Sequence, residues 1–224
     1  MRQNFKYLDV ITVLFVAVLL ISNIASTKIA RIFGFSLDGG TLLFPLAYIF
    51  NDVLTEVYGY NRSRKVIWLG FASAILMSVT LIVVGILPSA TGWENQDAYQ
   101  KILGQAPRIV IASLCAYFVG EFANSFILAK MKIASRGKWL WMRTIGSTLV
   151  GEMLDSLIFV TIAFAGVLPN ELIIALIISN YIFKTGIEII FTPITYVIVN
   201  FLKKAEREDY YDKKTNFNPF VVDK

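Results

Sequence analysis

The chain has 224 residues, of which 56% are hydrophobic and 17% are charged, and its mean hydropathy is +0.64. Soluble domains are typically about 45–50% apolar and about 25% charged, so this composition excludes a soluble globular domain. The chain has no histidine and one cysteine, Cys115, which excludes His-based triads, clustered His/Cys metal sites and an internal disulfide.

Six apolar blocks are long enough to cross a bilayer, which takes about 20 mostly apolar helical residues. We expect membrane spans over residues 10–27, 41–58, 66–87, 108–130, 145–168 and 172–201. The predicted fold is an all-α membrane protein, a six-helix bundle that forms one transmembrane domain over residues 1–202. Cys115 falls in the fourth block and is expected to be a small core residue.

The first block resembles a signal peptide, because Arg2 and Lys6 precede an apolar stretch. No A-x-A cleavage site follows it, so we expect it to be retained as a span. The second block contains Pro45 and several polar residues, which favours a broken or re-entrant helix. Pro193 is expected to kink the sixth block, because proline removes a backbone hydrogen bond.

Two segments lie outside the spans. Loop 88–107 carries Trp93 and Tyr99, and it either caps a cavity or connects two spans at the membrane interface. Residues 203–224 form a short charged tail, which we expect to be a solvated cytoplasmic extension. The sequence contains no phosphate-binding loop, so nothing indicates coupling to ATP hydrolysis.

The positive charges predict the topology, because cytoplasmic loops of membrane proteins are rich in Lys and Arg. Sixteen of the 21 Lys and Arg residues fall on one side of the six spans, together with both termini. The other side holds four: Lys28, Arg31, Lys101 and Arg108. We therefore expect a multi-pass protein with both termini in the cytoplasm.

Seven ionisable residues fall inside these otherwise apolar segments. A charge at the bilayer centre costs on the order of 3 kcal/mol even on lenient scales, so these side chains cannot face lipid. They must point into the bundle, where they pair, titrate or line a polar cavity. They are Asp52, Glu56, Glu121, Glu152, Asp155, Lys184 and Glu188.

Their spacing supports a cavity, because residues three or four apart lie on one helix face. The groups are Asp52 with Glu56, Glu121 with Asn124, Glu152 with Asp155, and Asn180 with Lys184 and Glu188, while Asn23 adds an amide to the first span. We therefore expect a central polar site that binds a substrate. The alternative is that these groups only join helices, although amides and hydroxyls are enough for that purpose.

Other residues near the acids have two interpretations. Gly120 and Gly151 either allow close helix approach or leave room for a ligand. Nearby aromatic residues either form a stacking platform for a flat ring or pack as ordinary membrane side chains. They are Tyr48, Tyr117, Phe118, Phe122, Tyr181 and Phe183.

Asp52, Glu56 and Arg64 are candidates for coupling or gating. Two carboxylates four residues apart on a desolvated face favour sharing a proton. Alternatively, Arg62, Arg64 or Lys65 holds both of them ionised as a structural clamp, which is the interpretation we favour.

Three runs of sequence resemble the queuosine precursor transporter family, also called the VUT family. They are NDVLTEVYGYNRSRKVIWLGF (51–71), STLVGEMLDS (147–156) and NYIFKTGIE (180–188). The resemblance spans nearly the whole chain. It implies a bacterial inner-membrane protein of six spans that imports 7-cyano-7-deazaguanine or 7-aminomethyl-7-deazaguanine. It also implies a fold like the substrate-binding components of energy-coupling-factor transporters, without their ATPase module.

The resemblance assigns functional roles to six positions: Asn23, Asp52, Thr55, Arg64, Asp155 and Lys184. The chemistry of the acids agrees independently, because one carboxylate can accept both the N1–H and the 2-amino donors of a guanine ring. The expected partners are this small molecule and the lipid bilayer, with no cofactor, metal or nucleic acid, and a homodimer remains open.

Two other functions use the same residues. The carboxylates are hard oxygen ligands, so a divalent-cation transporter is one alternative, although Lys184 opposes it. An intramembrane aspartyl protease is another, but the paired YD and GxGD signatures are missing from the sequence. The favoured hypothesis is therefore a transporter, driven by facilitated diffusion or by an ion.

Overall fold

A computed structural model describes residues 5–32, 35–166, 169–213 and 215–220. The elements in chain order are α1 (Leu8–Ala25), β1 (Ile29–Ile32), β2 (Phe35–Asp38), the 3-10 helix η1 (Gly39–Leu42), α2 (Phe44–Tyr58), α3 (Tyr60–Ile86), α4 (Gln96–Leu103), α5 (Ala106–Ala134), α6 (Leu140–Phe164) and α7 (Asn170–Glu206). Apart from one short hairpin, the described elements are helical.

In the described part of the chain, five helical segments are long and apolar enough to cross a membrane: α1, α3, the stretch Gln96–Ala134, α6 and α7. The prediction of a multi-pass all-α membrane protein is therefore confirmed. α2 is not among the five, because it has 15 residues and carries Asp52 and Glu56.

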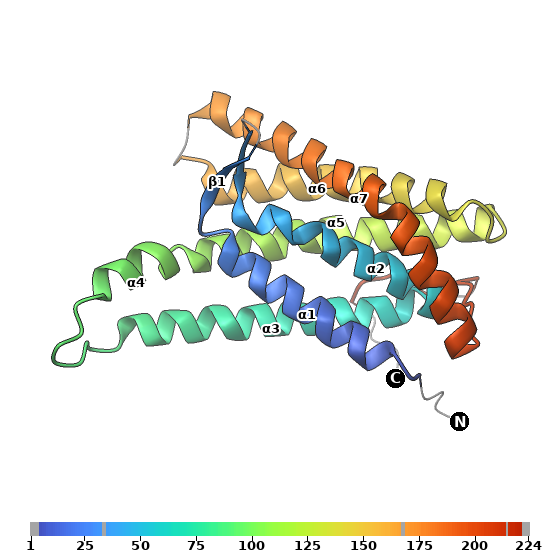
Figure 1. Ribbon diagram of the computed structural model, residues 1–224, viewed down its shortest axis with the longest axis horizontal. Helices are drawn as coiled ribbons and strands as arrows, with labels where there is room; N and C mark the ends of the chain where they lie inside the picture. The colour runs from blue at the N-terminus through green and yellow to red at the C-terminus, as the bar shows by residue number, and fades with distance from the viewer. Residues whose placement is uncertain (1–4, 33–34, 167–168, 214, 221–224) are drawn as a thin grey trace.

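The long helices alternate in direction along the longest axis of the molecule (Figure 1). α1, α3 and α6 run away from one end, and α2, α5 and α7 return to it. The start of α1 and the end of α7 therefore lie at the same end, which we call the terminal end. The hairpin, α4 and the start of α7 lie toward the opposite end, which we call the hairpin end.

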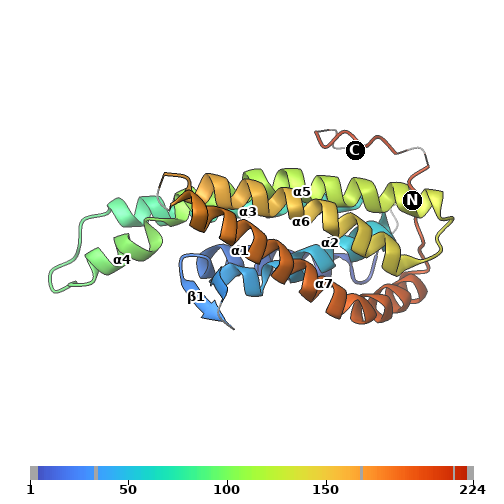
Figure 2. The ribbon, with the colours of Figure 1, turned by 90° about the horizontal axis from the view of Figure 1, so that it is seen from above.

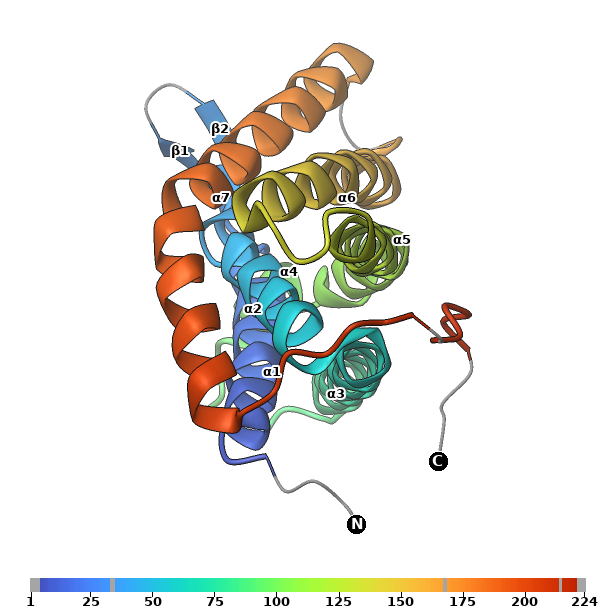
Figure 3. The ribbon, with the colours of Figure 1, turned by 90° about the vertical axis from the view of Figure 1, so that its right-hand side faces the viewer.

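α2 is the central helix of the bundle. Thirteen of its residues are buried, and it contacts α1, α3, α5 and α7; Figure 3 shows it enclosed by these four helices. A helix buried on all sides has no lipid-facing surface, so its polar residues avoid the cost of facing hydrocarbon. α2 therefore carries its carboxylates into the centre of the protein.

The breaks at the two ends of α2 have local causes. At its start, the Asp38 carboxylate accepts from the backbone N–H of Thr41 over 3.2 Å and so caps η1, the turn that leads into α2. At its end, Gly59 adopts a φ of 86°, which glycine tolerates best. The chain reverses there and enters α3 directly.

The sequence argument did not predict the hairpin or α4. β1 and β2 are antiparallel, with Ile29 opposite Asp38 and Ile32 opposite Phe35. In loop 88–107, α4 projects beyond the hairpin (Figure 2) and packs on α3, where the side-chain amide of Gln100 donates to the carbonyl of Gly85 over 2.6 Å. α4 is therefore a connector packed on α3. Pro193 lies inside α7, and α7 changes direction along its length in Figure 3.

Two expectations were wrong. Cys115 is exposed on α5 rather than buried in a core. Residues 209–213 and 215–220, which we call the C-terminal strap, are bound across the terminal end rather than solvated (Figure 3). The Arg64 guanidinium donates to the carbonyls of Asn216 over 2.9 Å and Asn218 over 2.6 Å, and the Trp68 indole donates to the carbonyl of Pro219 over 2.8 Å. The strap makes these contacts through its backbone carbonyls. Every residue has a backbone carbonyl, so the amino-acid composition of the tail did not reveal the contacts.

Candidate functional site

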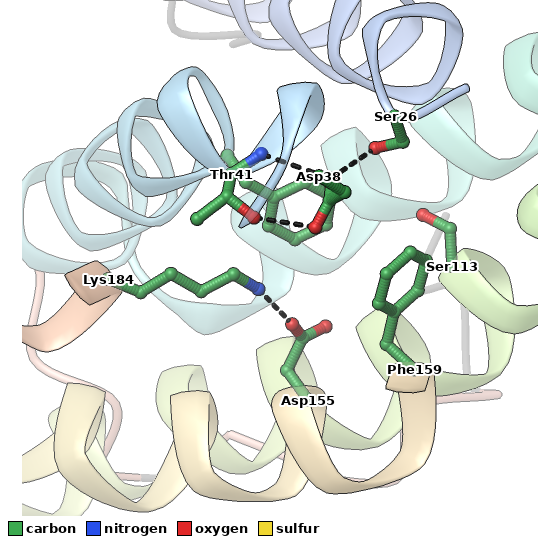
Figure 4. A pocket seen from close by; sticks show the side chains of 8 residues that line it. Ser26, Asp38, Thr41, Ser113, Asp155, Phe159 and Lys184 are labelled. Atoms are coloured by element: carbon green, nitrogen blue, oxygen red, sulfur yellow. Dashed lines mark hydrogen bonds and ion pairs between the residues drawn. The ribbon is translucent and has the colours of Figure 1, made fainter. Parts of the chain in front are cut away.

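A polar pocket lies inside the bundle, toward the hairpin end (Figure 4). Its cavity volume is about 10 Å³, which is room for about one water molecule, so the surrounding side chains must move apart before the pocket reaches the size of a ligand site. Side chains from α1, the hairpin, η1, α2, α5, α6 and α7 meet in it. They are Ser26, Asp38, Thr41, Phe44, Ser113, Asp155, Phe159 and Lys184.

A buried ion pair forms one wall of this pocket. The Lys184 ammonium donates to Asp155 Oδ2 over 2.6 Å and lies 3.5 Å from Glu152 Oε2. The same ammonium lies 4.5 Å from the centre of the Phe44 ring, within the range of a cation–π contact. One lysine on α7 thus contacts two carboxylates on α6, which compensates part of the cost of burying their charges.

Asp38 forms the opposite wall, and the sequence argument missed it. Its carboxylate accepts from Ser26 Oγ over 2.7 Å and from Thr41 Oγ1 over 2.6 Å, and its side chain is buried. Asp38 was missed because it precedes the second predicted span and lies outside the apolar blocks. The DGGT run (38–41) could have indicated it, because Asp38 is an N-cap type of residue placed just ahead of a helix.

A second pocket adjoins the first and shares Ser26 with it. Its cavity volume is about 380 Å³, and Gln105, Arg108, Ile109 and Phe164 are among its lining residues. Ile109 lies one helical turn from Ser113, which lines the inner pocket. This outer pocket, which we call the vestibule, therefore lies next to the inner pocket on the side of the hairpin end.

Deeper in the bundle, α2, α5 and α7 contribute a second polar layer. The Asn124 side-chain amide donates to Asp52 Oδ1 over 2.7 Å, and Asn51 donates to Ser125 Oγ over 2.8 Å. Glu121 and Glu188 are both buried there, and their carboxyl oxygens receive no hydrogen bond from the described residues. The predicted polar faces of α2, α5, α6 and α7 thus meet inside one bundle.

Gly120 and Gly151 allow close helix approach. A methyl group on Gly120 would lie 2.9 Å from the carbonyl oxygen of Gly151 and 2.6 Å from Tyr48 Oη. A methyl group on Gly151 would lie 3.0 Å from the carbonyl oxygen of Gly120. α5 and α6 therefore touch backbone to backbone at this level, with Tyr48 of α2 against the contact.

Glu56 belongs to a third cluster, at the terminal end. It pairs with Arg143 of α6 and with Lys203 of α7 over 2.6 Å, and it lies 3.5 Å from Lys132 of α5. We expected a clamp from Arg62, Arg64 or Lys65, but the cations that contact Glu56 come from three other helices. Sequence spacing identifies partners within one helix and cannot identify these.

The C-terminal strap completes this cluster. Asp209 accepts from Lys132 over 2.6 Å and lies 2.9 Å from Lys203. Partial burial opposes ionisation of Asp209, but hydrogen bonds from the two lysines outweigh that effect and hold its pKa below the usual value. The terminal end of the bundle is therefore joined by a network of charges across α2, α5, α6, α7 and the strap.

The remaining predicted residues lie apart from the inner pocket. Asn23 donates to the carbonyl of Leu19 within α1. Thr55 donates to Ser125 in the second polar layer, and Asn180 is buried on α7. The aromatic residues that line the inner pocket are Phe44 and Phe159, which were not among those expected to stack on a ligand.

Comparison with known proteins gives a consistent result. Residues 38–198 match the family model described as "Putative vitamin uptake transporter". The chain is 29% identical over 189 residues to the "Probable queuosine precursor transporter" of Bacillus subtilis, covering 83% of this chain and 82% of that protein. It is 28% identical over 208 residues to the "Queuosine precursor transporter" of Escherichia coli, covering 90% of each. No solved structure matches the chain.

Proposed function

The chain belongs to the putative vitamin uptake transporter family, and from that premise we propose that it imports 7-cyano-7-deazaguanine, 7-aminomethyl-7-deazaguanine or both across the bacterial plasma membrane. The names of its relatives support queuosine precursors as the substrate class. The observation that carries the proposal is the buried Asp155–Lys184 pair in the wall of a polar pocket. The Asp155 carboxylate offers an acceptor and the Lys184 ammonium offers a donor, and a guanine-type ring carries both donors and acceptors on one edge.

The guanine-type edge fits this pair chemically. Asp155 Oδ1 receives no hydrogen bond from the described residues, so it is available to the N1–H and 2-amino donors of the base. Lys184 then donates to O6. The two side chains neutralise each other, and an arriving base exchanges part of that pairing for its own hydrogen bonds.

Import also requires that the protein has a defined orientation in the membrane. The terminal end carries most of the Lys and Arg residues, so we place it in the cytoplasm by the positive-inside rule. α2 then completes a sixth pass, and the bundle is of the kind found in the substrate-binding components of energy-coupling-factor transporters. In this orientation the vestibule opens to the outside, and the Glu56 network and the C-terminal strap close the cytoplasmic end.

Transport proceeds without ATP hydrolysis, by facilitation or by coupling to an ion. In this proposal Asp155, Lys184 and Glu152 contact the substrate directly. Asp52 and Asn124 support the site from the second polar layer, while Glu56 and Arg64 hold the cytoplasmic closure.

Uptake complementation tests the function. The chain is expressed in a bacterium that neither makes nor imports the precursor, and queuosine is measured in its tRNA after a 7-deazaguanine is supplied. We expect queuosine to appear with the wild-type chain and not with an empty vector. Adenine-type 7-deazapurines, which lack the paired donor edge, should not compete for uptake. Equal competition by both rings, or binding of divalent cations in place of the base, would contradict the proposal.

A further inference from the structure

The interior of the bundle contains more acid than base. Six buried carboxyl groups lie in the inner pocket and the second polar layer, one from the hairpin (Asp38) and five from α2, α5, α6 and α7, and among the described residues there the only amine is Lys184. Lys184 contacts Asp155 and Glu152, and Asp52 accepts from Asn124. Glu121 and Glu188 are therefore the two acids of this interior that no amine or amide among the described residues contacts, and the neutral hydroxyl of Tyr117 is a donor toward Glu121.

The surroundings of these two residues do not compensate a negative charge. Glu121 on α5 is fully buried, and Glu188 on α7 is 1% exposed. The strongest electrostatic neighbours of Glu121 are Asp52, Glu152 and Asp155, and those of Glu188 are Asp52 and Glu152. Two further buried oxygens at this level, Tyr48 Oη and Asn124 Oδ1, receive no hydrogen bond from the described residues either.

An ionised carboxyl group in these surroundings raises the free energy of the folded protein. Burying an ionised carboxyl group without a partner costs far more than burying a neutral one, and the group avoids the cost by taking up a proton. A protonated carboxyl group can also donate, and oxygens without donors, such as Asn124 Oδ1, are its natural acceptors. Among the described residues, no group of three acids is arranged around a common point as a metal ion requires, whereas a proton needs only one carboxyl group.

We propose that Glu121 and Glu188 form a proton-binding site that couples substrate import to the inward proton gradient. The proposal rests on the proposed function for its direction of transport. It also differs from the expectation for Asp52 and Glu56, because Glu56 is held by Arg143 and Lys203, and a carboxylate paired with two cations is a poor proton carrier.

The proton-binding site contacts the substrate pocket through the packing of α5 against α6. Gly120, next to Glu121, packs against Asp155, since a methyl group on Gly120 would lie 3.0 Å from Asp155 Cβ. Tyr48 lies against both glycines of this contact. A change in the charge of Glu121 therefore acts on the backbone that supports the substrate-binding carboxylate. The titratable groups that face the site are Tyr48 and Asp52 from α2, Tyr117 from α5, Glu152 and Asp155 from α6, and Lys184 from α7.

The coupled step needs no other reactant. A proton from the outside binds a carboxylate when the pocket is open to the outside, and the carboxyl group is then neutral. After the bundle opens to the cytoplasm, the O–H bond breaks, the proton leaves to the cytoplasm and the carboxylate is restored. The substrate crosses chemically unchanged.

Infrared spectroscopy tests the proton site without any substrate. The carbonyl-stretch band of protonated carboxyl groups is recorded in purified wild-type protein at neutral pH. We expect this band to lose intensity in Glu121→Gln and in Glu188→Gln, and to stay unchanged in Glu171→Gln, which alters an exposed carboxylate at the start of α7. A spectrum that is the same in all four proteins would overturn the proposal.

Uptake into proteoliposomes tests the coupling. With the outside more acidic by one unit, and one proton moving per substrate, accumulation by the wild type should rise about tenfold. Glu121→Gln and Glu188→Gln, which imitate the protonated state, should lose this response but keep substrate exchange across the membrane. Retained exchange shows that the variants are folded, and Glu171→Gln should behave as the wild type.

The two proposals fail in different ways. Wild-type protein that carries 7-deazaguanines but ignores the pH gradient, or responds only to a sodium gradient, would overturn proton coupling and leave the proposed function intact. Wild-type protein that carries no 7-deazaguanine at all would overturn the proposed function. In that case the infrared measurement still decides whether Glu121 and Glu188 hold protons.

Discussion

The Nζ atom of Lys184 lies 2.6 Å from Oδ2 of Asp155, while the other oxygen of the same carboxylate receives no hydrogen bond from the described residues. The pair joins α6 to α7 at the wall of the inner pocket. An Asp–Lys pair with one oxygen unused can keep the empty protein stable and still bind a ligand that brings its own donors.

Asp155→Asn should weaken substrate binding. The change keeps the shape of the side chain but replaces an acceptor with a donor that faces the donor edge of the base. Unpaired buried groups cost roughly 1–3 kcal/mol, so we expect affinity to fall about tenfold to a hundredfold, measured by isothermal titration with a guanine-type 7-deazapurine. Asp97→Asn on α4 is the matched control. Wild-type affinity in Asp155→Asn would show that this carboxylate does not contact the base.

Lys184→Met should destabilise the protein as well as impair binding, because it leaves Asp155 and Glu152 without their cation. Breaking a buried pair by removing one partner costs roughly 3–5 kcal/mol. We expect a clearly lower melting temperature in detergent. The double variant Lys184→Met/Asp155→Asn should recover part of the loss, since it also removes a stranded charge. If the double variant is less stable than the single one, the pairing does not explain the loss.

Gly120→Ala should disturb the α5–α6 contact. The new methyl group would lie 2.6 Å from Tyr48 Oη and 2.9 Å from the Gly151 carbonyl oxygen, and such overpacking typically costs about 1–3 kcal/mol. Gly186→Ala is the matched control, because Gly186 is also helical and has nothing within 4 Å of the added position. Denaturation in mixed micelles should show a loss for the first variant and none for the second. Equal stability of the two would contradict the close approach.

Asp209→Asn should loosen the C-terminal strap by removing its bridge to Lys132 and Lys203. We expect faster cleavage by trypsin at Lys213, with Glu208→Gln as the control that leaves the bridge intact. The pH dependence follows from the lowered pKa of Asp209, which hydrogen bonds from the lysines hold down against partial burial. Docking is complete above the ordinary value of about 4 and is lost as the pH falls through the lowered one. The protection of the strap amides, measured as hydrogen exchange relative to the intrinsic rate at each pH, should therefore fall in acid. Protection that stays constant in acid, or that falls only above neutral pH, would contradict the bridge.

Cysteine labelling tests the orientation in the membrane. Ser89 lies beyond the end of α3, toward the hairpin end, and Ser135 follows α5 at the terminal end. In a Cys115→Ala background, which removes the exposed native thiol, Ser89→Cys should react with an impermeant reagent added outside intact cells. Ser135→Cys should react only after the cells are opened. The reverse pattern would invert both the topology and the proposed direction of transport.

The sequence predicted which charged side chains lie inside the bundle, because charge that faces lipid is costly. Each acid in an apolar block had to face inward, and the structure brings Asp52, Glu121, Asp155 and Lys184 into one interior. The positions of the long helices along the chain could also be predicted from the sequence, since length and hydropathy define them.

The contact partners of these residues could not be predicted from the sequence. Glu56 contacts Arg143 and Lys203, which lie 87 and 147 residues away in sequence, and no periodicity relates such positions. Asp38 was missed because it lies outside the apolar blocks. The C-terminal strap was missed because a charged segment has the same composition whether it is solvated or docked.

The burial of α2 has a consequence for how the protein is made. A segment with two acids and 15 residues is a poor substrate for the insertion machinery, which selects by hydrophobicity. Its polar partners Ser125 and Asn124 belong to α5, and Glu56 needs Arg143 of α6. These helices are synthesised after α2. We therefore expect α2 to reach its final position late, drawn in by helices that follow it, so that the topology is completed after translation has passed α6.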